Sequence, residues 1–140
     1  MKLTKTSDYA LRLITYLAKN KTLKSTPEIS GTLHVSYNNM IKLVQKLSKV
    51  GLISTKQGKY GGICLEKKPK DISIKEVIEA IEGPVSLSDC KKTKRCDLYA
   101  HCELRFVFED IQEKINESLA SVSIEDVMKR GLERRELCHP

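Results

Sequence analysis

Three cysteines stand at equal spacing in the second half of the chain: Cys90, Cys96 and Cys102, with five residues between neighbours. Thiolates are soft donors that select iron-sulfur clusters, zinc or copper(I). The spacing fits neither the short separation of paired zinc ligands nor a plant-type ferredoxin run. The array therefore predicts a metal centre and favours an unusual iron-sulfur site over zinc.

Three thiols leave one ligand position to fill. The candidates within or beside the cysteine segment are Asp89, Asp97, His101 and Glu103, and those elsewhere are Cys64, Cys138, His139 and Asp8. Charged residues interrupt the first twenty positions, and no segment approaches membrane-spanning length. We therefore expect a cytoplasmic protein without contact with a membrane, in which cysteines serve as ligands and not as disulfides.

The elements around the cysteines predict a sensor and dimerisation region over residues 71–140. A helix with a capping box at Ser73 and Glu76 ends at Gly83, and the polar segment 86–102, here called the cysteine loop, follows. A helix over about 101–120 comes next, then a short helix from Ser123 and a mobile tail from Arg134. The long helix carries an apolar stripe made of Leu104, Val107, Phe108, Ile111, Ile115, Leu119 and Val122. Because so small a chain cannot cover this stripe, we expect a homodimer.

Charge separates the two halves of the chain. Residues 1–70 contain 14 lysines and arginines against 3 acidic residues, a net +11, whereas residues 71–140 contain 11 against 15, a net −4. Clustered cations are what neutralisation of phosphates requires. The first half is thus expected to bind a polyanion, with nucleic acid as the leading candidate.

Helical periodicity predicts three helices in the first half, at residues 8–19, from a capping box at Ser25 and Glu28 to Leu33, and from Ser36 to Gly51. Strands at 52–54 and 63–65 flank a glycine-rich turn, which makes a hairpin. The predicted fold class is mainly α with this small β-hairpin: a winged helix-turn-helix domain over 1–70 plus a long C-terminal dimerisation helix. The third helix would enter the major groove of double-stranded operator DNA. The predicted DNA-binding residues are Tyr37, Asn38, Asn39, Lys42, Gln45, Lys46, Lys49, Lys56, Lys59 and Tyr60.

Together, the opening Leu3–Arg12 segment, the wing Gly58–Ile63 and the cysteine spacing resemble the NsrR/IscR-type family of winged-helix iron-sulfur transcriptional regulators. In IscR-like members a histidine three residues after the last cysteine completes the cluster site, and here that position is Arg105. In NsrR-like members the fourth ligand is an aspartate from the partner subunit, and Asp8 matches it. The resemblance therefore implies a cluster on Cys90, Cys96, Cys102 and Asp8, with 4Fe-4S preferred and 2Fe-2S as the alternative. Many members have arginine just before the wing, where this chain has Gln57.

The resemblance implies a transcriptional repressor that senses nitric oxide through its iron-sulfur cluster. The alternatives are an IscR-like regulator that senses cluster supply or redox state through another ligand such as His101, a zinc-stapled DNA-binding protein, and a small iron-sulfur carrier. The carrier would leave the basic first half without a purpose. No arrangement of nucleophile and base indicates an enzyme.

Overall fold

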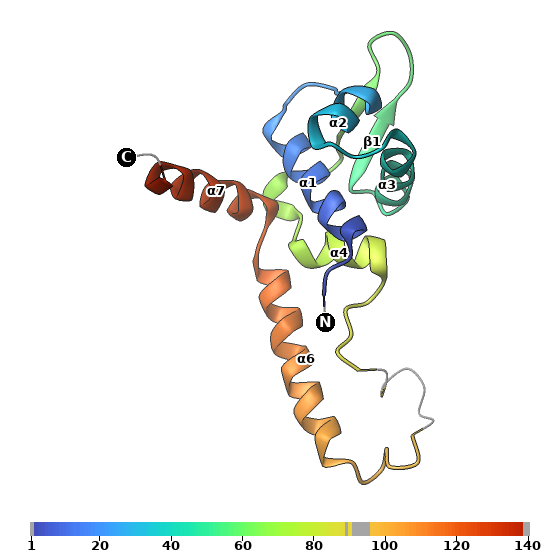
Figure 1. Ribbon diagram of the computed structural model, residues 1–140, viewed down its shortest axis with the longest axis vertical. Helices are drawn as coiled ribbons and strands as arrows, with labels where there is room; N and C mark the ends of the chain where they lie inside the picture. Colours follow the sequence, from blue (N-terminus) through green and yellow to red (C-terminus); the bar gives the residue numbers. More distant parts are fainter. Residues whose placement is uncertain (1, 89, 91–95, 139–140) are drawn as a thin grey trace.

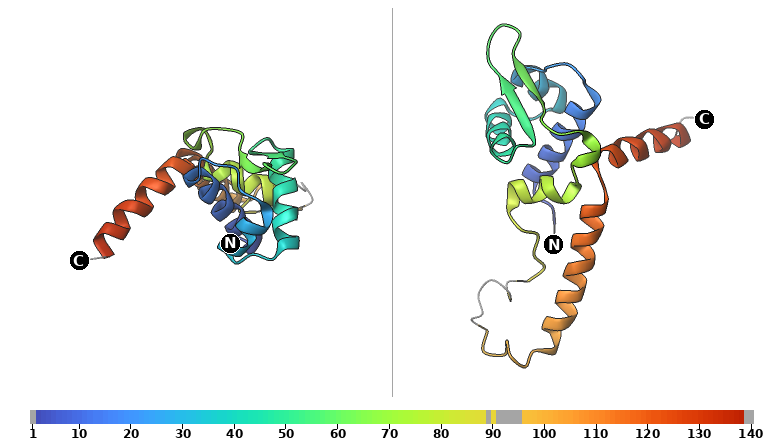
Figure 2. Two further views of the ribbon diagram at one scale, coloured as in Figure 1. Left: turned by 90° about the horizontal axis from the view of Figure 1, so that it is seen from above. Right: turned by 180° about the vertical axis from the view of Figure 1, so that it is seen from behind.

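The computed structural model describes residues 2–88, 90 and 96–138, with the side chains of 135–138 left out of the description. Its elements, in chain order, are α1 (Lys5–Lys19), α2 (Thr26–Leu33), α3 (Tyr37–Lys49), β1 (Ile53–Lys56), β2 (Gly62–Leu65), the 3-10 turn η1 (Pro69–Asp71), α4 (Ile74–Glu82), α6 (Glu103–Ser121) and α7 (Ile124–Cys138). The first part of the chain forms a winged-helix body from which α6 projects (Figure 1). Helix α7 leaves the body in another direction (Figure 2). The expected fold class, mainly helical with a small hairpin, is confirmed.

The helix-turn-helix begins earlier than the sequence pattern predicts. Helix α1 starts at Lys5 instead of residue 8, because the Thr4 side chain accepts a hydrogen bond from the amide of Ser7. Helix α3 is capped as expected, since the Ser36 hydroxyl accepts from the amide of Asn39. Gly51 follows it with φ of 75°, a conformation that favours glycine.

Only half of each expected capping box forms in α2 and α4. The Ser25 and Ser73 hydroxyls accept from the amides three residues later, as predicted. The carboxylate of Glu28 instead pairs with Lys24 at 2.9 Å, and that of Glu76 pairs with Lys67 at 2.5 Å. A two-way box forms at α7, where Ser123 and Asp126 hydrogen-bond reciprocally.

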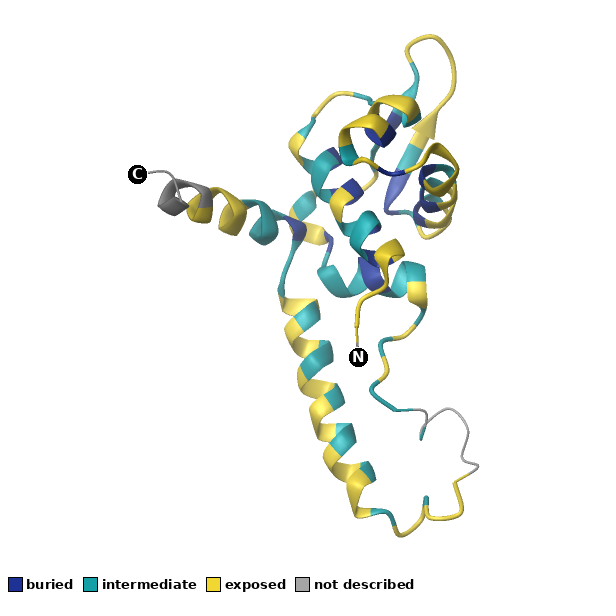
Figure 3. Cartoon of the chain, viewed as in Figure 1, coloured by how far each residue is buried: buried dark blue, intermediate teal, exposed yellow. Residues whose placement is uncertain are grey.

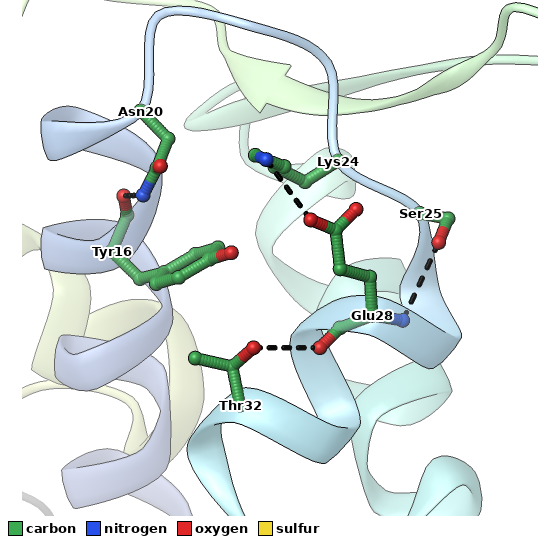
Figure 4. A network of polar contacts seen from close by, with 6 residues as sticks. All are labelled: Tyr16, Asn20, Lys24, Ser25, Glu28 and Thr32. Atoms are coloured by element: carbon green, nitrogen blue, oxygen red, sulfur yellow. Dashed lines mark hydrogen bonds and ion pairs between the residues drawn. The ribbon is translucent and has the colours of Figure 1, made fainter.

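The hairpin is longer than predicted, with Ile53 paired to Leu65 and Lys56 paired to Gly62 in antiparallel register. The segment before α2 also joins it, because Lys24 and Ile63 exchange backbone hydrogen bonds of 3.3 and 2.8 Å. The Lys24 ammonium reaches Glu28 on α2, and this hydrogen bond raises the pKa of Lys24 (Figure 4). The base of the hairpin is thus fixed against the helix-turn-helix.

One apolar core holds the body together. Leu13, Ile14, Met40 and Leu47 are fully buried in it. It also includes residues from beyond position 70, namely Ile72, Val77 and Ile124. The winged helix is therefore completed by α4 and the start of α7, and a division of the chain near residue 70 stays a prediction.

Helix α6 contains no buried residue along its whole length (Figure 3). Its predicted apolar stripe divides in two. Leu104, Val107 and Ile111 are 62%, 52% and 40% exposed, whereas the rest of the stripe is partly covered. The last helix is longer than expected, because α7 continues to Cys138, and the mobility of the tail from Arg134 stays a prediction. Across the described residues, no helix is both long enough and apolar enough to cross a membrane.

Candidate nucleic-acid interface and metal centre

Helix α3 presents a continuous polar face to solvent. Met40, Leu43 and Leu47 point into the core, so the residues between them are left outside. Those exposed residues are Tyr37, Asn38, Asn39, Lys42, Gln45, Lys46 and Lys49. They are the predicted DNA-binding residues of this helix, and their amide and ammonium groups suit base edges and phosphates. Val50, which follows the last residue of α3, is 48% exposed.

The hairpin forms a wing whose tip stands away from the body (Figure 1). Tyr60 is 85% exposed, and the Lys59 ammonium lies 5.8 Å from the centre of its ring. Gly61 is required by close approach of the backbone, since a Cβ there would lie 2.1 Å from the carbonyl oxygen of Lys56. Lys56 is also exposed. The wing thus offers cations and one aromatic ring on a tightly turned backbone.

The cysteine loop connects α4 to α6 and is attached to both. The amide of Val85 donates to the Glu79 carboxylate of α4, and that of Leu87 donates to the Gln112 side chain of α6. Cys90 is partly buried and lines a hollow of about 20 Å³ against α6, and Cys96 is exposed. Cys102 caps the start of α6 without using its side chain in a cap hydrogen bond, which leaves its thiol available.

Arg105 lies in the first turn of α6, close to the cysteine loop. It lines the same hollow as Cys90 and follows Cys102 by one helical turn. Its guanidinium stacks on the rings of Tyr99 and Phe106, 4.4 and 4.5 Å from their centres. Its Nε is buried and has no hydrogen-bond partner among the described residues. A cation with a spare donor in the hollow that Cys90 lines is suited to stabilising thiolate charge.

The thiols do not converge in this structure. Among the described residues, no group of three cysteine, histidine, aspartate or glutamate side chains is placed to hold a metal ion. The donor set nevertheless fits an iron-sulfur cluster chemically, because three thiols occupy one loop and Cys90 shares a hollow with the cation of Arg105. Of the other candidate ligands, Asp89, His139 and the side chain of Cys138 lie outside the described residues.

Asp8 lies in the first turn of α1 and forms an ion pair with Arg12, at 2.8 Å between Oδ2 and Nε. Both side chains are at least half exposed, at 50% and 62%. Such a pair contributes only about 0.3–0.5 kcal/mol. The Asp8 carboxylate is therefore available to a partner at small cost.

Sequence reasoning missed two residues that organise these sites, Lys24 and Glu82. Lys24 joins the wing to α2 through its backbone. Glu82 accepts hydrogen bonds from Thr4 and from Ser7, which is completely buried. No local signal pointed to Glu82, because its partner Ser7 lies 75 residues away in the sequence.

Known proteins resemble this chain over most of its length. Residues 3–130 match the Rrf2 family, described as "Iron-dependent Transcriptional regulator". The HTH-type transcriptional regulators NsrR of Shouchella clausii and Halalkalibacterium halodurans are each 35% identical over 133 residues. These alignments cover 91% of this chain and 89% and 90% of the two relatives.

Solved structures agree on the fold. CymR, the global cysteine regulator of B. subtilis, superimposes with a TM-score of 0.75 at 27% identity, covering 93% of this chain and 98% of that one. T. potens IscR gives a TM-score of 0.75 at 22% identity, covering 94% and 88%. The relatives are transcriptional regulators and not enzymes, as the sequence predicts. Because of these matches, and in agreement with the exposed recognition helix α3 and the wing, the chain belongs to the Rrf2 family of DNA-binding transcriptional regulators.

Proposed function

We propose that this protein is a homodimeric repressor that senses nitric oxide through an iron-sulfur cluster, preferably 4Fe-4S. Its ligands would be Cys90, Cys96 and Cys102 of one subunit and Asp8 of the partner subunit. The observation that carries the proposal is the loop of three cysteines rooted on α4 and α6, in a chain 35% identical to regulators named NsrR. When bound, the cluster would supply iron that reacts with nitric oxide.

The ligand set supports a labile centre. A carboxylate is a harder donor than a thiolate and binds cluster iron less strongly. Since the exposed Asp8–Arg12 pair is weak, Asp8 can leave Arg12 for a stronger partner and return to it. Arg105 cannot coordinate a metal, because its guanidinium stays protonated and has no acceptor. It can instead donate a hydrogen bond to a thiolate at Cys90, with which it shares a hollow.

The dimer is supported by the exposed side of α6. Leu104, Val107 and Ile111 are spaced so that they share one face of the helix, and all three are exposed. Burying such a face against a second copy removes apolar surface from water at about 25 cal/mol per Å². A two-fold dimer also suits operator DNA, since its two recognition helices enter successive major grooves.

Coupling between the cluster and DNA would pass through α1. Asp8 follows Ser7, which is tied to the end of α4, and α4 leads directly into the cysteine loop. Helix α1 also packs against α3. A change in the bond between the cluster and Asp8 of the partner subunit would therefore shift α1, and with it the recognition helix α3.

The test is anaerobic purification of the full chain, followed by iron and sulfide analysis and titration with nitric oxide. We expect brown protein whose visible spectrum and DNA affinity both change during the titration. Iron and sulfide with neither change would overturn the sensing role. Zinc without sulfide would overturn the cluster and favour a zinc-stapled regulator.

A further inference from the structure

A basic groove of about 410 Å³ lies between the first turns of α1 and the neighbouring side of α3. Its lining residues are Lys5, Thr6, Tyr9, Asn39, Lys42, Leu43 and Lys46. We propose that this groove binds a phosphate of the DNA backbone. The inference rests on the DNA-binding role of the family and adds α1 to the interface, which the sequence confined to α3 and the wing.

The charge of the groove favours an anion. Three of its lining residues are lysines, and none of the described lining residues is acidic. The ion pairs that the structure describes all involve other side chains, so these three ammonium groups are not neutralised by a described carboxylate. Lys46 donates to the carbonyl oxygen of Ile81 at 3.4 Å, which holds its ammonium toward the α4 side. Like charges gathered around one hollow are relieved when a phosphate enters.

Neutral donors complete the groove. Thr6 and Tyr9 carry hydroxyls and Asn39 carries an amide, all of which commonly donate to phosphate oxygens. The groove thus combines charge with hydrogen-bond donors from two helices.

The position of the groove matches the geometry of a duplex. Helix α3 lies below the wing and above the start of α1 in Figure 1 and in the right-hand view of Figure 2. A helix seated in a major groove about 12 Å wide has a phosphate backbone on each side. The wing can follow one backbone while the groove holds the other.

This placement sorts the polar residues of α3 into two roles. Lys42 and Lys46 line the groove and would contact phosphate, and Asn39 lies with them. Asn38 and Gln45 do not line it, and they are left to read base edges. Changing a groove residue should therefore weaken binding to every sequence alike.

The test uses the full chain and two fluorescent duplexes, one selected from a random pool by the wild-type protein and one scrambled. Affinity is measured by anisotropy between 50 and 200 mM salt. Lys5→Gln should lower the slope of log affinity against log salt by about 0.9 and weaken binding to both duplexes about five- to tenfold at 0.1 M salt. Lys19→Gln, at the other end of the same helix, is the matched control and should change neither.

An unchanged slope and affinity in Lys5→Gln would overturn the inference while leaving the proposed function intact. Wild-type protein that binds neither duplex would instead defeat the proposed function. A second experiment measures the melting temperature with and without inorganic phosphate. If phosphate raises the melting temperature of the wild-type protein but not of Lys5→Gln, and the DNA slope is unaffected, the groove is a site for free phosphate and the backbone role is wrong.

Discussion

The hydroxyl of Ser7 donates a hydrogen bond to Oε1 of Glu82, which joins the first turn of α1 to the last residue of α4. The same oxygen accepts from the amide and the hydroxyl of Thr4, at 3.2 and 2.8 Å. One carboxylate therefore holds the start of the helix that carries Asp8. It does so from the residue that precedes Gly83 and the root of the cysteine loop.

Replacement of Glu82 by alanine should destabilise the fold by about 2 kcal/mol. The loss includes charge-assisted hydrogen bonds and leaves the buried Ser7 hydroxyl without its acceptor. Denaturant unfolding of the metal-free protein measures this value. Glu66→Ala, which removes an exposed carboxylate after β2, is the control and should change stability by less than about 0.5 kcal/mol. Equal effects of the two changes would contradict the role given to Glu82.

The same contact predicts a dependence on pH. Hydrogen bonds from Ser7, and then from Thr4, lower the pKa of Glu82 in the folded protein. A lowered pKa means that this carboxylate stabilises the fold above its ordinary value of about 4.3, and that the contribution is lost as pH falls through the folded pKa. The melting temperatures of wild type and Glu82→Gln should converge as pH falls below about 4. A difference that stays constant from pH 7 to pH 3 would show that ionisation of Glu82 contributes nothing.

Gly61→Ala should weaken DNA binding. The added Cβ would overlap backbone atoms of Lys56 and Gln57, so the turn of the wing must change its conformation. Backbone strain that remains in the turn costs about 1–3 kcal/mol. We expect a loss of affinity of about tenfold, read by anisotropy on operator DNA. Gly31→Ala lies in α2 with open space around its Cβ and should bind normally. Normal binding by Gly61→Ala would remove the wing from the interface.

Val107→Glu should convert the dimer to a monomer. A carboxylate at this 52% exposed position would be buried without a partner in the proposed interface along α6. Sedimentation equilibrium gives the mass directly. Ala120→Glu places the same charge nine residues after Ile111, on the opposite side of the helix, and this variant should remain dimeric. If both variants keep the wild-type mass, the exposed stripe of α6 is not the dimer interface.

Asp8→Ala should shorten the lifetime of the cluster but not alter the stability of the metal-free protein. Only a weak exposed pair with Arg12 is lost from the subunit itself. Decay of visible absorbance in the presence of a chelator measures the lifetime under anaerobic conditions. Asp71→Ala removes another exposed aspartate and serves as control. A cluster as persistent in Asp8→Ala as in wild type would favour another fourth ligand, such as His101.

Local sequence patterns predicted the helices and the hairpin because short-range hydrogen bonds and periodic burial specify them. Ser36 and Ser73 cap their helices as expected, and Gly51 ends α3 with positive φ. The candidate ligands were equally visible, since cysteine spacing is a property of the chain. The positions of those thiols were not predictable, because they depend on how the segment after α4 is held by Glu79 and Gln112.

The sequence by itself determined which segments are helical or extended, which face of α3 is polar, and which residues can act as soft ligands. Only the tertiary structure decided which carboxylate Ser7 meets, that Glu76 pairs with Lys67, and which part of the α6 stripe stays exposed. The physical reason is the sequence separation over which each interaction acts. Periodicity and caps act over three or four residues, whereas Ser7 meets Glu82, and Lys24 meets Ile63, only after the intervening chain has packed around a common core.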